Sequence, residues 1–154
     1  LSGLQITAHL HEWRMNLATG ATSERELDDR NLEFPMCHPG KIARKRRYSY
    51  LAHIPYAIPA TFDGLVKVDL ETGAQTEHAY GDGVFGSEAP FVPRPGATDE
   101  DDGWLVSFVT DVKDWSSAVW VYDAQHVADG PIAKVRLPVR VPAGFHATWM
   151  PANA

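Results

Sequence analysis

A repeat of about 50 residues is the feature of this sequence that most limits how it can fold. The segment Asn16–Glu24 (NLATGATSE) recurs 53 residues later as Asp69–Glu77 (DLETGAQTE). A looser third copy begins at Val121–Ala124. In the two clear copies, a strand-like run leads into a Thr-Gly turn and a second strand. A period of this length with several strands per unit is typical of β-propeller blades.

Strand-like patterns outnumber helical ones along the chain. Runs that alternate, or that are rich in β-branched and aromatic residues, are predicted as strands. They span residues 9–17, 47–54, 64–70, 104–110, 117–123 and 132–137. The best helix candidate, Thr22–Arg30, is polar and short, and we predict a loop there. The expected fold is therefore all-β, with 11 Pro and 12 Gly supplying turns.

The chain holds about three such blade-like units within its 154 residues. Propellers typically have roughly four to eight blades, and an open arc would leave exposed strand edges, which natural proteins avoid. The sequence also opens at Leu1 in the middle of a pattern, without a turn or a cap. We therefore expect residues 1–154 to be part of a single propeller domain that is truncated at its N-terminus.

The net charge of −6 argues against a nucleic-acid partner, because phosphate contacts need a basic face. One basic cluster contains Lys41, Arg44, Lys45, Arg46 and Arg47. Charge runs of this kind usually form solvated loops. A weak contact with a membrane surface is the alternative, since the apolar stretch 54–58 follows closely.

The cysteine content and the hydropathy pattern bear on the compartment. Cys37 is the single cysteine, so no internal disulfide can form, which fits a reducing cytoplasm. No window of 18 apolar residues occurs, and the first residues lack a basic signal-peptide region. We expect a cytoplasmic protein, with a peripheral position at a membrane as the alternative.

The repeat also aligns three residues that can take part in metal chemistry, namely Glu33, Glu88 and His146. Equivalent positions of a propeller lie around one axis, so these side chains are expected to converge. Neutral imidazole is a first-choice ligand for iron, zinc or copper, and a nearby carboxylate can fix its tautomer. A lone histidine is more often structural, however, and a glutamate can simply cap a turn. Spacing alone leaves both interpretations open.

Several motifs resemble those of the carotenoid cleavage oxygenases. The similar segments are Leu32–Pro35, Arg47–Tyr50, Gly64–Asp69, Gly86–Arg94, Glu100–Leu105 and Leu137–Trp149. They occur in the family's order and with family-like spacing over the whole chain. The last segment is similar to the family's C-terminus, and especially to its bacterial lignostilbene-cleaving branch.

This resemblance implies the C-terminal arc, about three blades, of a seven-bladed β-propeller. The family holds Fe(II) with four histidines, and three glutamates hydrogen-bond three of those ligands. By motif, His146 matches the last histidine ligand, and Glu33 and Glu88 match two of the glutamates. The other ligands lie upstream in the family. The remaining histidines match no ligand: His9, His11, His38, His53, His78 and His126.

The function that the resemblance implies is that of a non-haem Fe(II) dioxygenase. Such an enzyme uses O₂ to cleave a conjugated C=C bond of an apocarotenoid or stilbene-type substrate into two carbonyl products. No side chain of this chain is predicted to act as a catalytic acid or base. Phe145, beside the predicted ligand, either lines a substrate pocket or packs in the core. The alternatives are a non-catalytic propeller that serves as a binding or scaffold module, and an inactive fragment; no protein partner is indicated.

Overall fold

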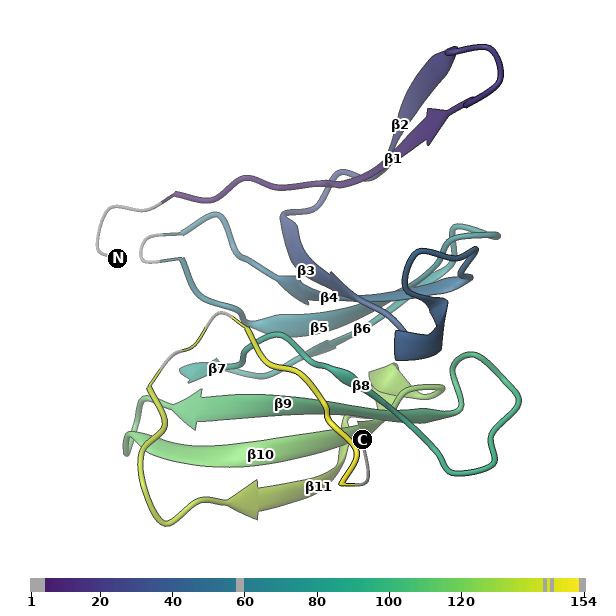
Figure 1. Cartoon of the computed structure of the whole chain (residues 1–154). Coiled ribbons are helices and arrows are strands. Elements are labelled where there is room, and N and C mark those ends of the chain that lie inside the picture. Colours follow the sequence, from purple (N-terminus) through teal and green to yellow (C-terminus); the bar gives the residue numbers. More distant parts are fainter. Residues whose placement is uncertain (1–4, 58–59, 143, 145, 153–154) are drawn as a thin grey trace.

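A computed structural model describes residues 5–57, 60–142, 144 and 146–152 (Figure 1). Apart from two 3-10 turns, at 39–41 and 127–129, all regular structure in these ranges is β-strand. The strands are β1 (Leu10–Met15), β2 (Thr22–Asp28), β3 (Leu32–Met36), β4 (Tyr48–His53), β5 (Gly64–Asp69), β6 (Gln75–Ala79), β7 (Val84–Phe85), β8 (Phe91–Pro93), β9 (Gly103–Asp111), β10 (Ser116–Asp123) and β11 (Pro131–Arg136). The predicted all-β class is confirmed.

The strands form two larger antiparallel sheets and one hairpin. One sheet has the order β3-β4-β5-β6, and the other has the order β11-β10-β9-β7, with β8 also paired to β9. The two sheets lie next to each other in Figure 1, whereas the β1–β2 hairpin projects away from them. Each larger sheet is a meander of sequential strands, as in a propeller blade. The arrangement agrees with the predicted partial propeller.

The repeat corresponds to the turn between the third and fourth strands of each unit. Asn16, Asp69 and Asp123 stand at or just beyond the ends of β1, β5 and β10. The side-chain Oδ1 of each accepts a hydrogen bond from the amide two residues later, at 3.0, 3.0 and 2.9 Å. Gly20 and Gly73 complete the first two turns with φ of 72° and 76°, which favours glycine. By this correspondence, β1–β2 is the outer half of a blade.

The prediction of a loop at Thr22–Arg30 is wrong, because Thr22–Asp28 is strand β2. Apart from Leu27, its side chains are polar, and most are exposed, so the apolar alternation that marks a strand is missing. Backbone pairing with β1 forms the strand instead, from Met15 opposite Thr22 to Leu10 opposite Asp28. The strand-turn-strand interpretation of the repeat was the correct one at this position.

Strands β4 and β5 are buried on both faces. One core cluster includes Tyr50 and Leu65 together with Phe91 and Leu105 of the second sheet. The other cluster includes Leu51, Val66 and Val68, and it extends to the hairpin through Leu10 and Leu32. Because side chains alternate along a strand, one pair of strands contributes to both clusters. The two larger sheets and the base of the hairpin are therefore packed around β4 and β5.

A buried ion pair and a capping carboxylate also join the two larger sheets. Lys67 Nζ of β5 lies 2.7 Å from Asp101 Oδ2, in the loop before β9. Glu100 Oε1 in the same loop accepts hydrogen bonds from the amides of Arg47 and Tyr48 at 2.7 and 2.9 Å. A buried charge is tolerated when it is paired and hydrogen-bonded. These contacts hold the loop before β9, which belongs to the second sheet, against β4 and β5 of the first sheet.

Members of the basic cluster have acidic partners within the chain. Lys41 Nζ is 3.6 Å from Glu100, Lys45 Nζ is 3.0 Å from Glu71, and an Arg47 nitrogen is 2.7 Å from Asp69. The Arg47 guanidinium holds the pKa of the Asp69 carboxyl well below its usual range. This pairing favours the solvated-loop interpretation, and the membrane contact stays a prediction. Within the described ranges, no helix has the length and apolar character to cross a membrane.

We expect the β1–β2 hairpin to be the least stable element of this chain. A two-stranded ribbon is marginal in water, and among the described strands β1 pairs only with β2. Amide hydrogen exchange followed by NMR should be faster in β1–β2 than in β4–β5, on the order of 100-fold or more. The β4–β5 amides serve as the internal control. Equal protection of the two pairs would contradict this assignment.

Candidate metal-ligand site

The chain turns inward at residues 86–88, just before β8. Gly86 has no Cβ, and one built there would lie 2.3 Å from the Tyr80 ring, so only glycine lets the backbone pass this close. Ser87 Oγ then accepts a hydrogen bond from the Phe108 amide at 3.2 Å, which attaches the turn to β9. The following side chain, that of Glu88, is only 4% exposed. A carboxylate is thus held inside the molecule at the inner edge of this sheet.

Two groups of the C-terminal segment contact the Glu88 carboxylate. His146 Nδ1 lies 3.4 Å from Glu88 Oε2, and the Ala147 amide donates to Glu88 Oε1. The described part of this segment has no regular secondary structure after β11, and it runs back past the second sheet (Figure 1). A buried carboxylate needs hydrogen-bond donors, and these two groups supply them. The contact therefore fixes the position of the segment as well as the imidazole.

The orientation of His146 suits metal ligation. A protonated Nδ1 would donate to Glu88, which leaves the lone pair on Nε2 for a metal. The His146 side chain is 79% exposed, whereas its carboxylate partner is buried. An exposed imidazole with a buried carboxylate behind it is the arrangement in which the carboxylate orients the ring and raises its basicity.

Glu33 directly precedes Phe34, whose ring is in contact with the imidazole of His146. Glu33 is the second residue of β3, and its Oε2 accepts a hydrogen bond from the amide of Phe34 at 3.1 Å. The Phe34 ring is in edge contact with the His146 ring, with centroids 5.2 Å apart and planes at 77°. The structure thus brings two of the sequence-predicted residues, Glu88 and His146, into contact, and it places Glu33 next to a residue that touches His146. Their roles toward a metal stay predictions, and Phe145 lies outside the described residues.

The other histidines have partners of their own. Carboxylates lie close to His9, His53 and His126, at 3.0, 2.6 and 3.6 Å, respectively. His11 stacks on Trp13, and the His78 ring packs against the Tyr122 ring. In the ranges that the structure describes, no group of three or more His, Cys, Asp or Glu is placed to hold a metal ion. Any metal site that includes His146 would need ligands from beyond these residues.

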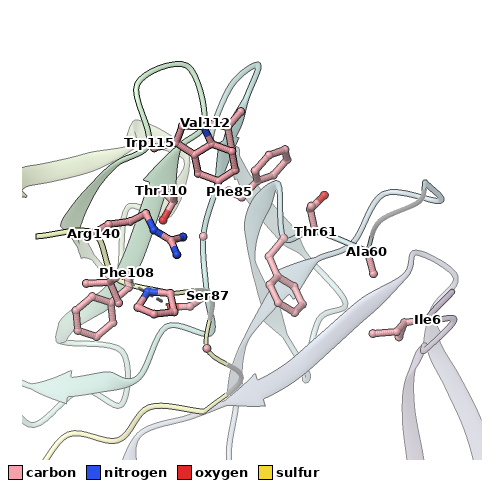
Figure 2. Close-up of a pocket in the computed structure, with 15 residues that line it drawn as sticks. Ile6, Ala60, Thr61, Phe85, Ser87, Phe108, Thr110, Val112, Trp115 and Arg140 are labelled. Carbon is pink, nitrogen blue, oxygen red and sulfur yellow. Dashed lines mark hydrogen bonds between the residues drawn. The ribbon is translucent and has the colours of Figure 1, made fainter. Parts of the chain in front are cut away.

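An apolar pocket lies between the loop before β5 and one side of the second sheet, and Phe62 and Phe85 are among its lining residues (Figure 2). Its volume is about 170 Å³, below the roughly 300–1,000 Å³ of typical ligand pockets. Arg140 points toward its centre in Figure 2. The Phe62 ring also contacts Phe34, with centroids 5.2 Å apart, so a chain of rings joins the pocket to His146.

Sequence patterns did not identify this pocket or the contact of Phe34 with His146. The lining residues come from separate parts of the chain, including the loop after β4, the strands β7 and β9, and the C-terminal segment. Only the folded structure brings them together. The run Leu32–Pro35 contributed to the family resemblance, but nothing in it indicated where the Phe34 ring would lie.

Comparisons with known proteins give a consistent result. The family model described as retinal pigment epithelial membrane protein matches residues 3–151. A carotenoid 9,10(9',10')-cleavage dioxygenase 1 of Pisum sativum is 39% identical over 156 residues. An apocarotenoid-15,15'-oxygenase of Synechocystis is 34% identical over 140 residues. Among solved structures, cobalt-substituted Synechocystis apocarotenoid oxygenase superposes with a TM-score of 0.87 at 30% identity.

These similarities cover nearly all of this chain but a small part of each relative. The Pisum alignment includes 92% of this chain and 28% of the dioxygenase, and the Synechocystis alignment includes 89% and 29%. The superposition on the cobalt-substituted structure covers 94% of this chain and 30% of that one. The chain thus spans less than a third of the length of these relatives.

We predict that Glu88→Ala releases the C-terminal segment. Loss of a hydrogen bond to a charged group costs roughly 1.5–3 kcal/mol, so exchange of the Ala147 amide hydrogen should become on the order of 10- to 100-fold faster. Glu77→Ala is the matched control, because it removes an exposed carboxylate of β6 that pairs with Arg30. NMR hydrogen exchange measures both variants. Unchanged protection of Ala147 in Glu88→Ala would contradict the anchoring role of Glu88.

Proposed function

This chain belongs to the retinal pigment epithelial membrane protein family, and on that premise we propose that it forms part of a non-haem Fe(II) dioxygenase. The proposed reaction uses O₂ to cleave a conjugated C=C bond of an apocarotenoid into two carbonyl products, with a stilbene-type alkene as the second substrate class. The relatives named above are carotenoid and apocarotenoid cleavage enzymes. The observation that carries the proposal is the contact between His146 and Glu88.

The residues present fit an iron site to which this chain contributes one ligand. An imidazole nitrogen suits Fe(II), and Nε2 of His146 is the atom left for it when Nδ1 faces Glu88. The remaining ligands would come from other parts of the complete protein, as the family resemblance implies. When bound, an iron ion with an open coordination position supplies the O₂-activating chemistry.

Glu88 would fix the tautomer and the direction of the His146 ring. Its own position is set by the turn at Ser87 and by the donor at Ala147, so it does not depend on the metal. A carboxylate behind a neutral imidazole also offsets part of the charge of a divalent ion. Glu33, beside Phe34, would add a second negative charge to the same region.

The apolar pocket supports a hydrophobic substrate. Aromatic and aliphatic side chains predominate in its lining, and its contacts lead through Phe62 and Phe34 to His146. Such walls would exclude water from a conjugated hydrocarbon. Because the volume of this pocket is small for a ligand site, we propose that this chain forms one wall of a larger substrate cavity.

The complete protein, loaded with Fe(II), should convert an apocarotenoid and O₂ into two carbonyl products that chromatography and mass spectrometry detect. We expect His146→Ala to lose bound iron and activity. His126→Ala is the matched control, because it removes an exposed histidine whose partner here is Asp123. Absence of cleavage of carotenoid, apocarotenoid and stilbene substrates by iron-loaded protein would refute the proposed reaction.

Glu88→Gln keeps the size of the side chain but removes its charge. In the complete protein we expect iron affinity and turnover to fall roughly 10- to 100-fold, as is typical when the carboxylate behind a histidine ligand is replaced. Glu77→Gln changes an exposed carboxylate in the same way and should leave both values unaltered. Iron content and rate equal to those of the unmodified protein would show that Glu88 has no role toward the metal.

A further inference from the structure

Phe34 has a backbone conformation that is rare for its residue type. Its φ of +54° lies in the left-handed region, where a side chain crowds the following carbonyl group. Strained residues of this kind persist only where the surrounding structure enforces them, and they cluster at functional sites. The conformation therefore calls for a local explanation.

A β-bulge accounts for the unusual backbone. Glu33 of β3 is opposite Ala52 of β4, but the next pair joins Met36 to Tyr50, so two residues of β3 face one of β4. The second of these two residues of β3 is Pro35, which has no amide hydrogen to donate to the sheet. Bulges of this type bend a strand and redirect a side chain. Here the redirected side chain is that of Phe34.

The redirected ring contacts the rings of both His146 and Phe62. Its centroid is 5.2 Å from each of these rings, with interplanar angles of 77° and 54°. Rings in edge-on or tilted contact attract each other beyond the area that they bury. These contacts therefore act against the strain of the Phe34 backbone.

His146 needs such a contact because one hydrogen bond does not define the plane of its ring. The imidazole is 79% exposed, and its hydrogen bond to Glu88 is long, at 3.4 Å. An imidazole that is attached through Cβ and hydrogen-bonded only at Nδ1 can still tilt, and this tilt moves Nε2. A second contact, from a side chain fixed by the backbone, removes this freedom.

We propose that Phe34 is a positioning residue for His146. The bulge holds the Phe34 ring against the imidazole, and Glu88 and Phe34 together set the direction of Nε2. The inference rests on the proposed function in that it treats His146 as a metal ligand. It goes beyond that function because it assigns a role to the strained backbone of β3.

The test uses Co(II) as the probe in the complete protein, because its visible absorption reports the ligand geometry. Phe34→Tyr keeps the ring, Phe34→Leu keeps apolar bulk without the ring, and Phe34→Gly removes both the ring and the backbone strain. We expect Phe34→Tyr to bind Co(II) as the unmodified protein does. The other two variants should bind roughly 10-fold or more weakly, with an altered spectrum.

Thermal unfolding separates this role from a purely structural one. Phe34→Gly relieves an unfavourable φ, so a folded variant with weaker Co(II) binding supports positioning. Folded Phe34→Leu and Phe34→Gly variants with unchanged affinity and spectrum would overturn it. If the unmodified protein itself bound no Co(II), the proposed function would fail. Nuclear Overhauser effects from the His146 ring protons to the Ala147 amide and the Glu88 side chain would then decide the inference: a loss or redistribution of these effects in Phe34→Leu upholds it, and an unchanged pattern refutes it.

Discussion

The buried carboxylate of Glu88 is the interaction on which the candidate site depends. A negative charge with only 4% exposure is stable only when donors face it, and the C-terminal segment provides those donors through His146 and Ala147. One residue thus attaches an otherwise irregular segment to the second sheet and orients an imidazole. The same contact anchors the C-terminal segment and orients the imidazole of His146, so the site cannot form without the docked segment.

The contact of Phe34 with His146 requires the two larger sheets to keep a fixed position relative to each other. The Lys67–Asp101 pair and the capping of β4 by Glu100 fix the loop before β9 against the first sheet. The shared core around Tyr50 and Leu65 adds apolar packing between the two sheets. As a result, Phe34 from the first sheet and Glu88 from the second meet at one histidine. Parts of three chain segments form the site, and the inter-sheet contacts keep them together.

The sequence predicted the blades because their turns are periodic, whereas the roles of the three candidate residues came from the family resemblance. The turns at Asn16 and Asp69 recur with the repeat, and aligning the units placed Glu33, Glu88 and His146 in equivalent positions. Strand β2 was missed, since its polar residues form a strand through pairing with β1 and not through their own pattern. The left-handed backbone of Phe34 was also beyond prediction. A bulge depends on how two strands pair, and phenylalanine has no preference for it.

The central claim is that His146, held by Glu88, is a metal ligand. Anomalous scattering at the iron edge from crystals of the complete, iron-loaded protein tests it most directly. We predict an iron peak within coordination distance of His146 Nε2, with Nδ1 still facing Glu88. An iron peak away from His146 would contradict it. So would the absence of an iron peak at His146 in crystals where Nδ1 still faces Glu88.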